Sequence, residues 1–82
     1  MKLNEPLLII NLKTFEEGTG KKALEIAKIA LKASKTTKNS IIIAGQAVDL
    51  RELTKTKAVV ISQNIEAINY GSNTGHLLPE AV

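Results

Sequence analysis

The chain has 82 residues, which suffice for one small domain that buries about 60–65% of its unfolded surface. Its 11 basic and 8 acidic residues are scattered, and only one Phe and one Tyr could stack on bases, so nucleic-acid binding is a weak interpretation. Without Cys it has no disulfide or thiolate metal ligand, and no apolar run reaches the length of a signal-peptide core or a membrane span. We expect a soluble, cytoplasmic protein with no metal site and no membrane or nucleic-acid partner.

The first predicted element is a strand within residues 7–13, an apolar run that ends in polar side chains. A continuous apolar run followed by a helical pattern is typical of a parallel strand buried on both faces. Because side chains alternate along a strand, Asn11 and Lys13 share one face and Leu12 takes the other. Ligands bind at the carboxyl ends of parallel strands, so this amide and ammonium form a candidate site. The alternative is that Lys13 only marks the exit of the strand into solvent.

The second predicted element is a helix from residue 21 to about residue 35. Its small and apolar side chains recur at steps of three and four, while Lys and Glu occupy the opposite, solvated face. Thr19 lies in a glycine-containing loop before this helix and is its expected N-cap. With a second apolar strand at residues 41–44, these elements predict a right-handed βαβ unit.

Two further elements extend the expected sheet. Asp49 and Glu52 have the spacing of a capping box, which predicts a short helix from residue 50 to about residue 55. Residues 58–62 then form a third buried strand. Polar side chains follow all three strands, as expected of a site at the carboxyl-terminal face of a β/α barrel. These polar residues are Asn11, Lys13, Gln46, Gln63 and Asn64.

A long connection from residue 64 to residue 76 carries Ile65, Ile68 and Tyr70. Connections of this length without regular structure are usually functional, and exposed apolar side chains favour a protein contact. The pattern at residues 79–81 then predicts the start of a helix, and the sequence stops at Val82, within one turn of that start. We therefore expect a chain that is cut short within a larger α/β domain.

Several segments resemble the N-terminal portion of archaeal-type triosephosphate isomerases. Asn-Leu-Lys-Thr at residues 11–14 resembles the end of that family's first strand, and Ala-Gly-Gln at residues 44–46 resembles the end of its second. Gly-Ser-Asn-Thr-Gly-His at residues 71–76 resembles the family's interface loop and is the most specific of these motifs. The resemblance covers the whole chain.

The resemblance implies an α/β fold made of parallel β/α units of a TIM (β/α)8 barrel, truncated after the third strand. Residues 1–82 would be the N-terminal part of a single barrel domain, with no second domain. The implied activity is the interconversion of glyceraldehyde 3-phosphate and dihydroxyacetone phosphate in glycolysis and gluconeogenesis, without a cofactor or metal. Lys13 would be a catalytic residue that contacts substrate and stabilises negative charge, and Asn11 would bind substrate and orient Lys13.

The resemblance also implies a homo-oligomer, a dimer or a tetramer, formed through the loop 64–76. Thr74, Gly75 and His76 of this interface loop would lie near Asn11 and Lys13 of a neighbouring subunit.

The family's general base, a Glu, and its electrophile, a neutral His, would lie beyond Val82, so we expect negligible isomerase activity from the 82 residues alone. His76 matches the interface loop rather than the catalytic His. The alternatives are a small non-enzymatic α/β module that oligomerises through residues 64–76, and a degenerate fragment no longer held to function. Three residues stand where the family usually has Pro: Gly45, Ala67 and Tyr70.

Overall fold

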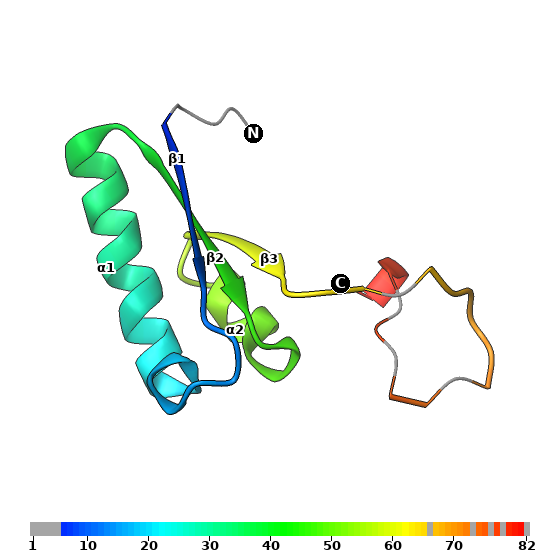
Figure 1. Ribbon diagram of the computed structural model, residues 1–82. Coiled ribbons are helices and arrows are strands. Elements are labelled where there is room, and N and C mark those ends of the chain that lie inside the picture. Colours follow the sequence, from blue (N-terminus) through cyan, green and yellow to red (C-terminus); the bar gives the residue numbers. More distant parts are fainter. Residues whose placement is uncertain (1–5, 66, 73, 76, 78, 82) are drawn as a thin grey trace.

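The computed structural model describes residues 6–65, 67–72, 74–75, 77 and 79–81. These residues form one sheet of three parallel strands, which two α-helices connect (Figure 1). The strands are β1 (Leu7–Asn11), β2 (Ser40–Gly45) and β3 (Val59–Ser62). The α-helices are α1 (Lys21–Thr37) and α2 (Leu50–Thr54). The 3-10 turns are η1 (Glu16–Gly18), η2 (Ala47–Asp49) and η3 (Pro79–Ala81).

The strand order β1-β2-β3 with parallel pairing confirms the predicted α/β class and its β/α units. Asn11 at the end of β1 pairs with Ala44 of β2, and Gly45 at the end of β2 pairs with Ser62 of β3. Because the strands run in the same direction, their carboxyl ends meet at one edge of the sheet. The candidate site predicted from the sequence lies at this edge.

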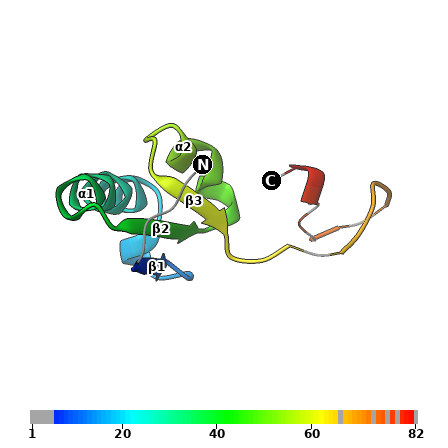
Figure 2. The ribbon, with the colours of Figure 1, turned by 90° about the horizontal axis from the view of Figure 1, so that it is seen from above.

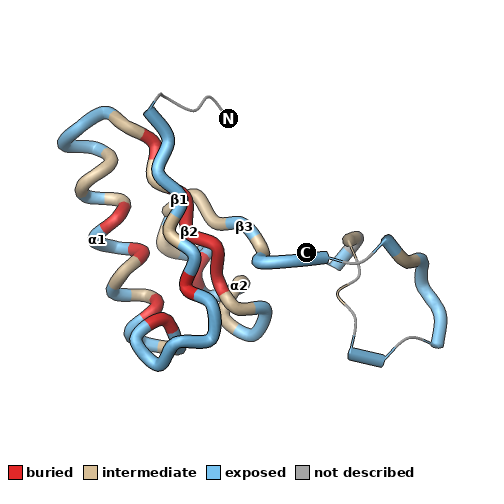
Figure 3. The backbone as a smooth tube through the Cα atoms, in the orientation of Figure 1, coloured by how far each residue is buried: buried red, intermediate tan, exposed pale blue. Residues whose placement is uncertain are grey.

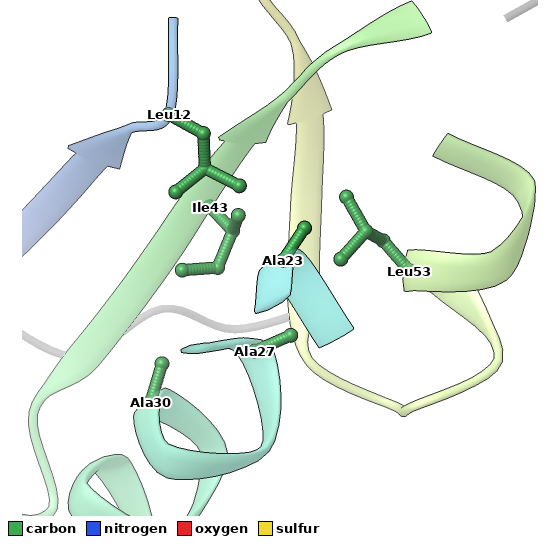
Figure 4. Packing of buried hydrophobic residues seen from close by; sticks show 6 residues of the cluster. All are labelled: Leu12, Ala23, Ala27, Ala30, Ile43 and Leu53. Carbon is green, nitrogen blue, oxygen red and sulfur yellow. The ribbon is translucent and has the colours of Figure 1, made fainter. Parts of the chain in front are cut away.

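Both α-helices pack on the same face of the sheet (Figure 2). On that face Ile43 of β2 lies between Ile10 of β1 and Val60 of β3 in the strand register. The alanines of α1 have short side chains, so the helix backbone can approach the sheet closely. The buried cluster that results consists of Leu12, Ala23, Ala27, Ala30, Ile43 and Leu53 (Figure 4).

The opposite face of the sheet is open along β1 and β3. The backbone of β1 is coloured largely as exposed (Figure 3). Leu7 and Ile9 of β1 are 47% and 56% exposed, and Ile61 of β3 is 43% exposed. We predicted that the first strand is buried on both faces, and for β1 this prediction is wrong. The reason is that β1 lies at an edge of the sheet. No element in the described part of the chain covers its second face, and on the helix side Leu8 is also 53% exposed. Only the central strand β2 is buried along most of its length. The prediction of a third buried strand is wrong as well, because no residue of β3 is fully buried at the other edge of the sheet.

Both predicted helices form, but the N-cap predicted for α1 is wrong, and the N-cap predicted for α2 lacks its capping hydrogen bond. Gly20 rather than Thr19 is the N-cap of α1, and the Thr19 hydroxyl donates to the Phe15 carbonyl at 2.8 Å instead. Asp49 is the N-cap residue of α2, as predicted, but its side chain makes no capping hydrogen bond to that helix. Its carboxylate accepts a hydrogen bond from the Gly20 backbone N–H at 3.1 Å. A contact between distant segments has therefore replaced the local capping box.

Two glycines lie where another residue would collide with its surroundings. A Cβ at Gly18 would lie 2.7 Å from the Leu12 Cβ and 3.0 Å from the Leu12 carbonyl oxygen. A Cβ at Gly45 would overlap Leu53 Cδ1, the far end of a flexible side chain that can move. Gly18 therefore permits a close approach of η1 to the end of β1, and Gly45 permits a close approach of α2 to β2.

Replacing Gly18 with Ala is expected to lower the free energy of unfolding by about 1–3 kcal/mol, because the new methyl group would push against the Leu12 backbone. Chemical unfolding followed by circular dichroism measures this difference. The matched control is Glu17→Ala, an exposed neighbour within the same turn, for which we expect a change within about 0.5 kcal/mol. Equal stabilities of the two variants would contradict the packing argument.

Candidate functional site

The candidate site begins at the carboxyl end of β1, where the chain turns sharply. Asn11 is the last residue of β1, and its side-chain oxygen accepts a hydrogen bond from the Lys13 backbone N–H at 2.9 Å. Lys13 has a φ of 48°, a left-handed conformation that costs a non-glycine residue about 1–3 kcal/mol. Such strain clusters at functional sites, and here the Asn11 side chain helps to hold it. A turn, and not the alternation of a continuing strand, therefore sets the direction of Lys13.

Gln63, which directly follows β3, reaches across the ends of the other two strands. Its side-chain NH2 group donates to the Lys13 carbonyl at 2.9 Å and to the Ala44 carbonyl at 3.3 Å. One amide thus ties the turn after β1 to the ends of β2 and β3. The structure therefore brings Asn11, Lys13 and Gln63 together at one edge of the sheet.

Gln46 does not join this group, although the sequence pattern placed it there. β2 ends at Gly45, and the chain enters η2, so the alternation of a strand no longer decides where the Gln46 side chain lies. Its NH2 group donates to the Thr19 hydroxyl at 2.9 Å and, at the long distance of 3.4 Å, to the Gly18 carbonyl. Gln46 therefore contacts the loop between β1 and α1.

The described residues of the predicted interface loop extend away from the sheet in both ribbon views (Figures 1 and 2). Thr74 and Gly75 are exposed, and His76 lies outside the described residues. Within the same loop Ile65 and Tyr70 are 52% and 76% exposed. The structure does not bring Thr74 and Gly75 to the Asn11 and Lys13 of their own chain.

The chemistry available at the strand ends is that of binding an anion. An exposed ammonium can bind a phosphate or carboxylate oxygen through charge-assisted hydrogen bonds. Among the residues that the structure describes, no group of three or more His, Cys, Asp or Glu side chains could hold a metal ion. In that same part of the chain no helix is long and apolar enough to cross a membrane.

Parallel β/α units with polar side chains at the carboxyl ends of the strands are features of the β/α-barrel class of protein, and open α/β sheets share them. The family model for triosephosphate isomerase matches residues 6–82. A triosephosphate isomerase of Methanocaldococcus jannaschii is 47% identical over 77 residues, an alignment that covers 93% of this chain and 35% of that protein. One from Methanoculleus marisnigri is 40% identical over 81 residues, covering 98% of this chain and 36% of that protein.

The chain therefore belongs to the triosephosphate isomerase family. This confirms the family that its motifs resemble and the parallel β/α fold that the family implies. The chain spans only 35% to 36% of the length of these two curated relatives.

One contact at this edge of the sheet could not be found from the sequence. Asp49 and Gly20 are separated by 29 positions, and nothing in the local pattern around Asp49 indicates a partner at that distance. The capping-box spacing instead suggested a contact within its own helix. Only the packing of the β2–α2 connection against the β1–α1 loop shows the pair.

Proposed function

We propose that this chain provides the substrate-binding Lys and Asn of a triosephosphate isomerase, which interconverts glyceraldehyde 3-phosphate and dihydroxyacetone phosphate. Lys13 contacts the substrate and stabilises negative charge on its phosphate and on the enediolate. Asn11 binds substrate and orients Lys13. The observation that carries the proposal is the position of Lys13, an exposed cation at the carboxyl edge of a parallel sheet. Asn11 and Gln63 bind the backbone of Lys13 and hold it there.

We also propose that residues 1–82 act as the N-terminal part of one barrel domain. Two observations support this role. The outer strands β1 and β3 each have one edge without a partner strand in the described part of the chain. Ile9 and Ile61 are about half exposed on the face of the sheet that neither helix covers. Further strands of a barrel would pair with these edges and cover this face.

A hybrid enzyme tests the proposed function. In this hybrid, the 82 residues replace the matching segment of the Methanocaldococcus jannaschii relative, whose remaining sequence supplies the rest of the barrel. We expect the hybrid to isomerise triose phosphates with a kcat/KM within about 100-fold of the relative's, since a misplacement of about 1 Å costs as much as that. We expect the 82 residues alone to show no turnover.

Two results would contradict the proposal. A folded hybrid without isomerase activity would show that the strand ends of this chain cannot serve in such a site. Turnover by the purified 82 residues, abolished by Lys13→Ala, would show that the catalytic groups of the reaction are already present in this chain.

We propose in addition that residues 64–76 form a contact with a second subunit in the assembled enzyme. The exposed apolar side chains of Ile65 and Tyr70 support this role, because apolar side chains gathered on an exposed loop favour a protein contact.

Tyr70→Ser in the hybrid is therefore expected to weaken the oligomer about tenfold or more, since a buried interface Tyr often contributes over 1.4 kcal/mol. Sedimentation at several protein concentrations measures the change. The matched control is Val48→Ser, which removes an apolar side chain that is 84% exposed and lies outside this loop. An unchanged oligomer in the Tyr70 variant would argue against the contact.

A further inference from the structure

The loop that carries Lys13, residues 13–20, is held at both of its ends by side chains from other parts of the chain. At its first end, Asn11 and Gln63 bind the backbone of Lys13. At its second end, Gln46 and Asp49 bind residues 18–20 from the connection between β2 and α2. The first pair belongs to the site already described, whereas the second pair has no role in it.

Asp49 binds the last residue of the loop. Gly20 has a φ of 59° and is the N-cap of α1, and its N–H donates to the Asp49 carboxylate at 3.1 Å. A carboxylate is a strong acceptor, and its charge is favourable near the amino end of a helix as long as α1. A Cβ at Gly20 would meet no atom within 4 Å, so the positive φ and not a lack of space makes glycine the suitable residue. Asp49 therefore fixes the point where the loop joins α1.

Gln46 binds the two preceding residues through one NH2 group, which donates to the Thr19 hydroxyl and to the Gly18 carbonyl. The Thr19 hydroxyl in turn donates to the Phe15 carbonyl at 2.8 Å. The result is a chain of hydrogen bonds that starts at the end of β2 and ends two residues from Lys13.

The loop between these two ends is short and internally bonded. The Gly18 N–H donates to the Phe15 carbonyl at 3.0 Å, and the Phe15 N–H donates to the Leu12 carbonyl at 3.3 Å. Gly18 also packs directly against Leu12, which is buried and precedes Lys13. These hydrogen bonds and this contact form a continuous connection from residues 18–20 to Leu12, the neighbour of Lys13.

We propose that Gln46 and Asp49 are positioning residues for Lys13, because they clamp the far end of its loop to the β2–α2 connection. This inference rests on the proposed function for its consequence in catalysis. Its structural part, the coupling of Asp49 to Lys13 through residues 15–20, stands independently of any activity. Neither residue touches the substrate in this proposal, and each acts through the loop.

The test compares Asp49→Ala and Asp49→Asn in the hybrid enzyme with the control Glu52→Ala. Glu52 is an acidic residue of α2 whose carboxylate pairs with the exposed Lys55 at 3.0 Å. We expect Asp49→Ala to lower kcat/KM about tenfold, because small misplacements of a catalytic group cost up to about 100-fold. Asp49→Asn keeps an acceptor oxygen and should recover most of this loss. The Glu52 variant should stay within about twofold of the unchanged hybrid, as expected for an exposed side chain remote from the site.

A second measurement in the 82-residue chain follows the loop directly. Amide hydrogen exchange at Gly20 should be faster in Asp49→Ala, and the Lys13 amide resonance should shift, whereas Glu52→Ala should change neither. If Asp49→Ala prevents folding, Gln46→Glu replaces it in both experiments, since a carboxylate of similar size cannot donate to Gly18 and Thr19.

The outcomes separate this inference from the proposed function. If the unchanged hybrid is folded and inactive, the proposed function fails. The shift of the Lys13 amide resonance in Asp49→Ala then decides alone whether Gln46 and Asp49 position Lys13. If the hybrid is active and Asp49→Ala speeds exchange at Gly20 while kcat/KM and the Lys13 resonance match the Glu52 control, the inference is wrong. A loss of kcat/KM that only follows a smaller folded fraction, with kcat/KM per folded enzyme unchanged, would also overturn it.

Discussion

Lys13→Met in the hybrid enzyme is expected to lower kcat/KM about 10²–10³-fold, the range found when one group that stabilises a developing oxyanion is removed. Met keeps the length of the side chain and removes its charge. Asn11 and Gln63 bind the backbone of residue 13, so the turn after β1 keeps both hydrogen bonds in the variant. The loss therefore reports on the ammonium group and not on a collapse of the loop. Steady-state kinetics with glyceraldehyde 3-phosphate measure it.

Lys22→Met is the matched control for this prediction. Lys22 is an exposed cation near the same loop, and its ammonium lies 3.8 Å from the Glu16 carboxylate, which is also exposed. Surface pairs of this kind contribute about 0–1 kcal/mol, so we expect little change in activity or stability. If Lys13→Met kept most of its activity, or if both variants lost activity equally, the assignment of Lys13 as a catalytic residue would be wrong.

Ile43→Ala is expected to lower the free energy of unfolding of the 82-residue chain by about 2–5 kcal/mol. Ile43 lies on the central strand, is fully buried, and contacts the cluster formed by α1, α2 and the end of β1 (Figure 4). A cavity there would have walls on several elements, so relaxation of one side chain could not fill it. Single domains are stable by about 5–15 kcal/mol, and a small one with an open sheet face has little to lose. Urea unfolding followed by circular dichroism measures the effect.

The control for Ile43→Ala is Ile29→Ala, which removes the same atoms from a side chain of α1 that is 68% exposed. Its effect should stay within about 0.5 kcal/mol. Leu53→Ala provides a second variant from the other side of the same cluster and should resemble Ile43→Ala. Similar stabilities of the Ile43 and Ile29 variants would show that this cluster is not the core of the chain.

The regular elements could be predicted because their signals are local. The apolar runs at residues 41–44 and 58–62 became β2 and β3 within one residue at each end, and the helical repeat became α1, which continues to Thr37. Apolar periodicity reports which side chains face a core, and that information lies within each segment. The order of strands followed from the βαβ connections.

The hydrogen-bond partner of Asp49 and the burial of β1 could not be predicted, because both depend on neighbours that are distant in sequence. A capping box at Asp49 and a carboxylate that binds another helix look the same within the local sequence. Similarly, the apolar run of β1 predicts two buried faces, but burial requires covering elements. In the described part of the chain Leu7, Leu8 and Ile9 are all about half exposed.

The sequence by itself determined the family, the parallel β/α order and the two residues, Asn11 and Lys13, that the proposed site needs. Only the tertiary structure decided how those residues are held. Gln63, which follows β3, donates to the Lys13 and Ala44 carbonyls, and Gln46 and Asp49 bind the other end of the loop, across separations of 19 to 50 positions. The physical reason is that a side-chain hydrogen bond depends on where two backbones pass each other in space. That arrangement is set by the packing of α1 and α2 on the sheet and leaves no periodic signal in the sequence.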